Sequence, residues 1–188
     1  MPGAPAVEVD DLLVSVPPSC VAFKHGAGLH VVPGSKELFL FPSLLYTQLS
    51  AAANLGPRSQ VTTKNILRSV EQLIASLRKH TGATKVLIDT SPFFGGATHL
   101  GWVAAEALVI PVRVDQHSMQ ALKLTLSMLQ KEEMDFLRLN SQGAITKRPK
   151  VHAIVMTHCG WNRQSAFTPD RSTQAYLSQV IQIAKENS

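Results

Sequence analysis

The chain has 188 residues, of which 45% are hydrophobic and 16% are charged, and its formal net charge is +5. These values predict a single globular domain, residues 1–188, with a sizeable core, and they exclude an intrinsically disordered chain. The sequence contains no apolar run of the length that a membrane span needs and no secretory signal at its start.

The first half of the chain predicts mainly helices. Residues 9–13 have the pattern of a short helix, and residues 28–34 that of a short strand ending in a turn. A helix interrupted near Pro42 is expected over residues 36–53. A clear amphipathic helix then begins at Thr62 or Thr63, ends before Gly82, and carries its apolar stripe on Ile66, Val70, Leu73, Ile74 and Leu77.

The second half alternates strands and helices. Short apolar runs at 86–88, 108–112 and 151–156 predict buried parallel strands, which end at Asp89, Pro111 and Thr157. One helix is expected from residue 116 to about 139, and Asp170 is expected to cap a last helix. This alternation predicts an α/β fold with a doubly wound, mostly parallel sheet and helices on both faces.

Asp89 is the main candidate for chemistry. A carboxylate at the end of a buried strand faces the crevice where open α/β sheets bind ligands. There it can hold Mg²⁺ through water or orient an attacking water. Alternatively, Asp89 caps the turn that follows. Gly95 and Gly96 give that loop the freedom to approach a ligand, and Thr98 is expected to cap the next helix.

The stretch around Asp89 has a specific pattern. It comprises Asp89-Thr90-Ser91-Pro92, Gly95, Thr98, Ala104-Ala105 and Val109-Ile110-Pro111-Val112. Without a gap, this pattern resembles the core of the ParA/MinD partition ATPases, which belong to the P-loop class. The family usually has Asp where Glu106 stands. The resemblance implies a three-layer α/β/α, P-loop NTPase or Rossmann-like fold.

The resemblance also implies site residues. Asp89 corresponds to the catalytic Walker B acid, which holds Mg²⁺ through water. The residues expected to contact ATP are Thr90, Pro92, Gly95, Pro111, Asp115 and Thr157. The family often has an acid shortly after the threonine that ends the third strand, whereas here Thr157 is followed by His158, Cys159 and Gly160. Base recognition is therefore expected to differ.

The phosphate loop is the larger departure from the family. No Gly-rich loop ending in Gly-Lys-Ser/Thr occurs in this sequence, although phosphoryl transfer needs a phosphate cradle and a lysine. The chain is therefore expected to be a truncated or hydrolysis-deficient member that binds ATP weakly or not at all. Because the family's phosphate-loop strand is central, its absence implies exposed strand edges and a dimer or an aggregating monomer. The alternative is a non-catalytic interaction module with the same fold.

Partners and compartment follow from the same resemblance. It implies ATP-dependent homodimerisation, non-specific DNA binding and a ParB-like partner protein in the bacterial cytoplasm, in contact with the nucleoid. Residues 138–188 hold seven basic residues against two acidic ones, seven minus two giving the whole excess of +5. This basic region can meet DNA phosphates or form a solvated face. Cys20 and Cys159 predict two free thiols rather than a disulfide framework.

A second short motif points elsewhere. The run His158-Cys159-Gly160-Trp161-Asn162 is similar to part of the sugar-nucleotide box of plant-type glycosyltransferases. That box continues with Ser where this chain has Arg163, and its upstream Trp and Gln are absent here. A sugar-nucleotide transferase is the interpretation that rests on these five residues alone, and a short motif of this kind often matches by chance.

Overall fold

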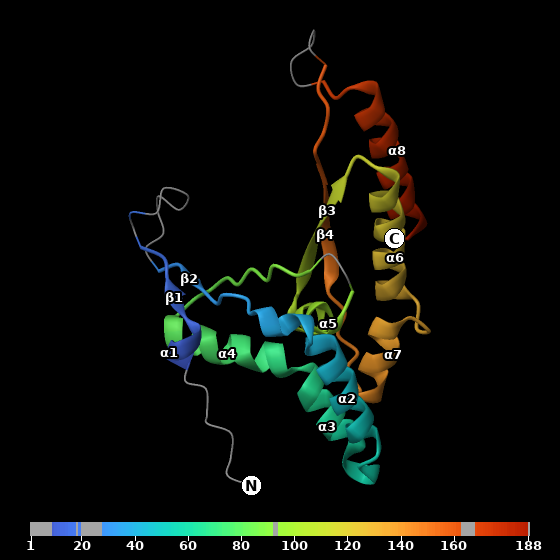
Figure 1. The fold of residues 1–188 in the computed structure, drawn as a ribbon. Coiled ribbons are helices and arrows are strands. Elements are labelled where there is room, and N and C mark those ends of the chain that lie inside the picture. The colour runs from blue at the N-terminus through green and yellow to red at the C-terminus, as the bar shows by residue number, and fades with distance from the viewer. Residues whose placement is uncertain (1–8, 18, 20–27, 92–93, 163–167, 188) are drawn as a thin grey trace. The chain divides into compact units, whose positions relative to one another are not determined.

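The computed structural model describes residues 9–17, 19, 28–91, 94–162 and 168–187, and it has mixed α/β structure. The chain divides into two compact units, residues 1–104 and 105–188. Within the described residues, none of the helices is long and apolar enough to cross a bilayer. Figure 1 shows the elements of both units.

Unit 1 is largely helical. Its elements are α1 (Val9–Leu12), β1 (Val14–Ser15), β2 (His30–Val31), η2 (Lys36–Phe39), α2 (Phe41–Ala53), η3 (Gly56–Arg58), α3 (Ser59–Leu67), α4 (Ser69–Thr81) and α5 (Gly96–Ala104). The two short strands pair antiparallel. α2 contacts α3 and α5, and α5 also contacts α4. The core of this unit is built from the buried side chains of Leu45, Leu49, Ala52, Leu67, Leu100 and Val103.

The helix predictions for unit 1 hold in type and differ in their boundaries. The predicted interruption near Pro42 is confirmed, because Pro42 occupies the first turn of α2 after η2 has ended. The amphipathic helix is two helices that meet at Arg68, whose ψ of 9° turns the chain. The predicted cap at Thr62 or Thr63 is wrong, since the helix already begins at Ser59. Gly82 ends α4 as predicted, with a left-handed φ of 71°.

The predicted buried strand at 86–88 is wrong. This segment is extended, but within the described part of the chain it pairs with no strand. Val86 is 49% exposed and Leu87 is 94% exposed. A run of β-branched and aliphatic residues favours a strand only where a neighbouring edge supplies backbone partners, and none of the described strands offers such an edge to it.

Unit 2 is a small α/β unit. It contains β3 (Ala107–Arg113), α6 (Gln116–Gln130), α7 (Asp135–Gln142), β4 (Lys150–Thr157) and α8 (Arg171–Glu186). β3 and β4 pair in parallel, from Ala107 with Lys150 to Arg113 with Thr157, and the register shifts between Leu108 and Val109. Both strands were predicted, and their positions and parallel pairing are confirmed, but among their residues only Val112 is buried. The helix expected over 116–139 is two helices, because the backbone becomes extended at Lys131.

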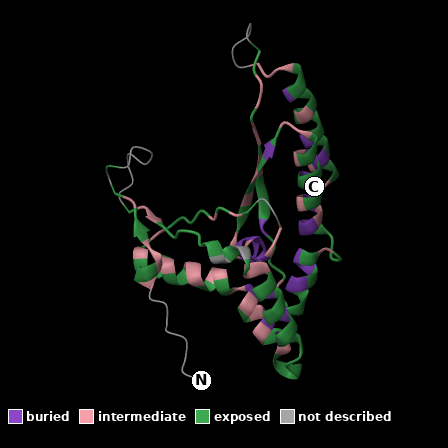
Figure 2. Ribbon diagram, viewed as in Figure 1, coloured by how far each residue is buried: buried purple, intermediate pink, exposed green. Residues whose placement is uncertain are grey.

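The core of unit 2 lies between one face of the strands and the helices α6 and α8. It consists of Val112 from β3, Met119, Leu122 and Leu126 from α6, and Val180 and Ile183 from α8. Ile110, Ile154, Met156 and Tyr176 pack against this cluster. On the other face of the strands, Val109, Pro111 and Val155 are exposed (Figure 2). The described residues thus contain a two-stranded parallel sheet, not the larger sheet that was expected.

Candidate functional site

The carboxyl end of β3 and β4 gathers two of the predicted site residues. Thr157 is the last residue of β4 and pairs with Arg113, the last residue of β3. Its hydroxyl donates to the carbonyl oxygen of Val112 over 3.4 Å. Asp115 follows two residues after β3 and caps α6, since its Oδ1 accepts the Ser118 backbone N–H at 2.8 Å. This is the end of a parallel sheet at which α/β proteins bind ligands.

Arg113 partly balances the negative charge of Asp115 at the carboxyl end of β3. The Nε of Arg113 lies 3.7 Å from Oδ2 of Asp115, and both side chains are more than one third exposed. Such an exposed ion pair contributes little to stability. Pro111 was expected at the end of this strand, but it lies within it, because β3 continues to Arg113. A proline lacks the N–H that a central strand needs, which explains why it is tolerated on a strand with a free edge.

Hydrogen bonds join the start of α8 to the residues that follow β4. Asp170 caps the helix, as predicted, by accepting the Thr173 backbone N–H at 2.8 Å. The hydroxyl of Thr173 accepts the Gly160 backbone N–H at 3.0 Å, and the Asp170 N–H donates to the Gly160 carbonyl at 3.0 Å. Trp161 and Pro169 form a β-bridge just beyond. These contacts define the 160–173 clamp, formed by Gly160, Asp170 and Thr173.

Gly160 fits this clamp because it has no side chain. A Cβ built on Gly160 would lie 2.1 Å from Oδ2 of Asp170, far closer than atoms can approach. His158, two residues earlier, has a φ of 56°, which only a few non-glycine residues adopt. The cap at Asp170 was predicted from the sequence, whereas its contact with Gly160 was not. The threonine three residues after the cap was the available signal.

The two capping carboxylates have lowered pKa values. The Ser118 backbone N–H lowers the pKa of Asp115, and the Thr173 backbone N–H lowers the pKa of Asp170. Because the folded-state pKa values are lowered, the caps stabilise the fold above the ordinary carboxyl pKa of about 3.9. This stabilisation is lost as the pH falls through the folded-state values.

The pH dependence can be tested with asparagine at both caps. Asparagine still accepts the capping hydrogen bond but does not titrate near pH 4. We expect the double variant Asp115→Asn, Asp170→Asn to lose less stability between pH 6 and pH 3 than the natural chain, a range taken around the ordinary carboxyl pKa of about 3.9. Urea unfolding followed by circular dichroism at both pH values measures this difference. An identical loss in both proteins would contradict the role of the two caps.

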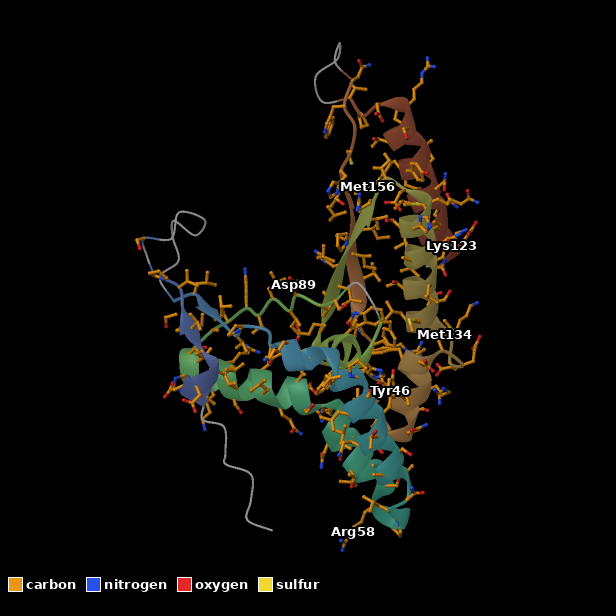
Figure 3. The ribbon with its side chains drawn as sticks, in the orientation of Figure 1. Tyr46, Arg58, Asp89, Lys123, Met134 and Met156 are labelled. Carbon is orange, nitrogen blue, oxygen red and sulfur yellow. The ribbon has the colours of Figure 1, made fainter. Side chains whose placement is uncertain are left out.

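Asp89, the main sequence candidate, lies in unit 1 on the extended segment before α5 (Figure 3). It is exposed, and Thr90 and Ile88 beside it are partly buried. Gly101 of α5 allows this close packing, because a Cβ there would lie 3.1 Å from Cγ2 of Thr90 and 3.6 Å from Cγ2 of Ile88. Pro92 lies outside the described residues, and Gly95 directly precedes α5.

Thr98 has a different role from the one expected. It is the third residue of α5, not its cap, and it is buried. Its hydroxyl donates to the Ser91 carbonyl at 3.3 Å, which ties the extended segment to the helix. Of the predicted site residues, Asp89, Thr90 and Gly95 belong to unit 1, and Pro111, Asp115 and Thr157 belong to unit 2.

The residues that the structure describes do not form a complete site for MgATP. Among the described residues, no group of three His, Cys, Asp or Glu side chains is placed to hold a metal ion. The sequence contains no phosphate loop, and Asp89 stands on an exposed segment rather than at the end of a paired strand. The capping oxygens of Asp115 and Asp170 are already engaged with backbone N–H groups.

Comparisons with known proteins give no relative for this chain. No protein-family model, no curated protein and no solved structure matches it.

Proposed function

We propose that this chain is a ParA/MinD-like protein of plasmid or chromosome partitioning that binds and hydrolyses ATP poorly by itself. One observation carries the proposal. The pattern from Asp89 to Val112 runs into β3, a strand paired in parallel with β4, and Asp115 and Thr157 stand at the carboxyl ends of these strands. A strand–helix–strand unit with polar residues at that end is the arrangement from which nucleotide-binding α/β domains are built. The proposed complete fold is a three-layer, doubly wound sheet.

The proposed role depends on binding to a second copy, to DNA and to a partner protein more than on ATP hydrolysis. The resemblance to the ParA/MinD family implies ATP-dependent dimerisation and the positioning of DNA together with a ParB-like partner. Positioning of the phosphates and charge neutralisation supply most of phosphoryl-transfer catalysis, and this sequence lacks the loop for both. We therefore assign no hydrolytic step to its residues. DNA is a proposed contact of the basic residues within 138–188.

The second candidate is a non-catalytic interaction module with the same fold. The exposure of Leu87 and the open face at Val109 and Val155 favour it, since single domains rarely leave such apolar segments uncovered. In that case the sheet edges contact a protein and no nucleotide is needed. Both candidates predict a protein–protein contact, and they differ in whether ATP binds at all.

Titration calorimetry with ATP and Mg²⁺ separates the two candidates. For the natural chain we expect binding weaker than about 100 μM, because the phosphate cradle is absent. If a residual nucleotide site exists, Asp89→Ala should abolish its Mg²⁺ dependence, while the control Asp11→Ala should not change it.

Either outcome is informative. Micromolar binding that Asp89→Ala abolishes would support the partition ATPase and contradict the weak-binding part of the proposal. Complete absence of binding in all three proteins would support the interaction module instead.

A further inference from the structure

The segment of residues 85–89, Lys85-Val86-Leu87-Ile88-Asp89, is extended and open on its outer side. Lys85, Leu87 and Asp89 are all exposed. Ile88 and Thr90, by contrast, are partly buried and face Gly101 of α5. Within the described residues, no backbone hydrogen bond involves the N–H or C=O groups of residues 84–90. The segment therefore has the properties of an unpaired edge strand held on a helix.

The sequence of this segment is complementary to itself. When two copies run antiparallel around a two-fold axis at Leu87, residues whose numbers add to 174 lie opposite each other. Lys85 then faces Asp89 of the second copy, and Val86 faces Ile88. Leu87 faces its own counterpart. Both charged pairs are attractive, and β-branched pairs directly opposite each other also stabilise antiparallel strands.

The alternation of side chains suits this arrangement. Residues two apart share a face of a strand, so Lys85, Leu87 and Asp89 lie together on the outer face. Two copies would bring their leucines together at the centre of that face, with a Lys–Asp pair on each side. The other face keeps Ile88 against α5 in each copy. Leu87, the most exposed of the described large apolar side chains, would then gain a partner.

We infer that the chain forms a two-fold homodimer by antiparallel pairing of residues 85–89, centred on Leu87. The partner is a second copy of this chain, and the pairing needs no nucleotide. It is therefore separate from the proposed ATP-dependent dimerisation. Backbone hydrogen bonds supply the contact, while the Lys85–Asp89 pairs fix its register and direction.

A charge swap tests the register. Lys85→Asp alone and Asp89→Lys alone each place two like charges opposite each other, and each should weaken the dimer roughly tenfold or more. The double variant Lys85→Asp, Asp89→Lys exchanges the two charges and restores the complementarity, so its dimer dissociation constant should return close to that of the natural chain. Lys123→Asp, at an exposed position of α6, is the control and should change nothing. Sedimentation equilibrium without nucleotide measures all five proteins.

A crosslink tests the two-fold axis. In antiparallel strands, residues facing each other have Cα atoms about 5 Å apart, which a disulfide can bridge. In a chain whose Cys20 and Cys159 are replaced by serine, Leu87→Cys should give a covalent dimer with diamide as the oxidant. Leu44→Cys, at a leucine of α2 that is 56% exposed, should not. A monomer at every concentration would overturn the inference. So would a dimer whose dissociation constant is unchanged by the single charge substitutions and which Leu87→Cys does not crosslink.

Discussion

Replacing Gly160 by alanine is expected to lower the free energy of unfolding by about 3 kcal/mol, because the new Cβ has no room in the 160–173 clamp. It would lie 2.1 Å from Oδ2 and 2.7 Å from Cγ of Asp170, so the carboxylate must move. Asp170 caps α8, and its movement also breaks the hydrogen bond from the Thr173 N–H. Urea unfolding followed by far-ultraviolet circular dichroism measures the loss.

Two variants show whether the Gly160→Ala effect comes from this contact. Gly34→Ala is the matched control, since its Cβ would meet only Leu38 Cδ1, at an ordinary 3.8 Å. We expect that variant to be near neutral. Asp170→Ala removes the carboxylate that Gly160→Ala displaces. In a double-mutant cycle, Gly160→Ala should therefore cost much less stability in the Asp170→Ala variant than in the natural chain. Fully additive effects would contradict the proposed clash.

Leu122→Ala is expected to cost about 3 kcal/mol of stability. Leu122 is 1% exposed, and it lies on α6 at the centre of the cluster that joins β3, α6 and α8. Removing most of its side chain loses the free energy of burying that surface and leaves a cavity between the helices and the sheet. Chemical denaturation of the purified variant at neutral pH gives the difference directly.

The same helix offers a matched control for Leu122→Ala. Leu124 is two residues away and is 53% exposed. Leu124→Ala makes the same chemical change on the same helix, but it leaves no cavity, so we expect a cost below about 1 kcal/mol. Equal costs at the two positions would mean that α6 does not pack against the strands through the face containing Leu122.

The sequence by itself determined the elements whose signals are local. Helical spacing of apolar residues predicted α4, α6 and α8, and Gly82 and Asp170 marked helix ends because their cap chemistry depends on a few neighbouring residues. The apolar runs of β3 and β4 were also predicted, since each is long enough to read as a strand. Thr157 ends β4, as its apolar run predicted, and it lies at the same end of the sheet as Asp115.

Tertiary structure decided what depends on residues far apart in the sequence. The run at 86–88 was predicted as a strand, like β3, yet it pairs with no strand among the described residues, because a strand needs a neighbouring edge to supply its hydrogen bonds. The breaks at Arg68 and Lys131 were likewise not predicted, since neither position carries a helix-breaking residue. Gly160 and Asp170 meet only because β4 and α8 bring the two ends of a loop together. Local preferences thus fix the elements, and long-range contacts, which no short window of sequence contains, decide which of them pair.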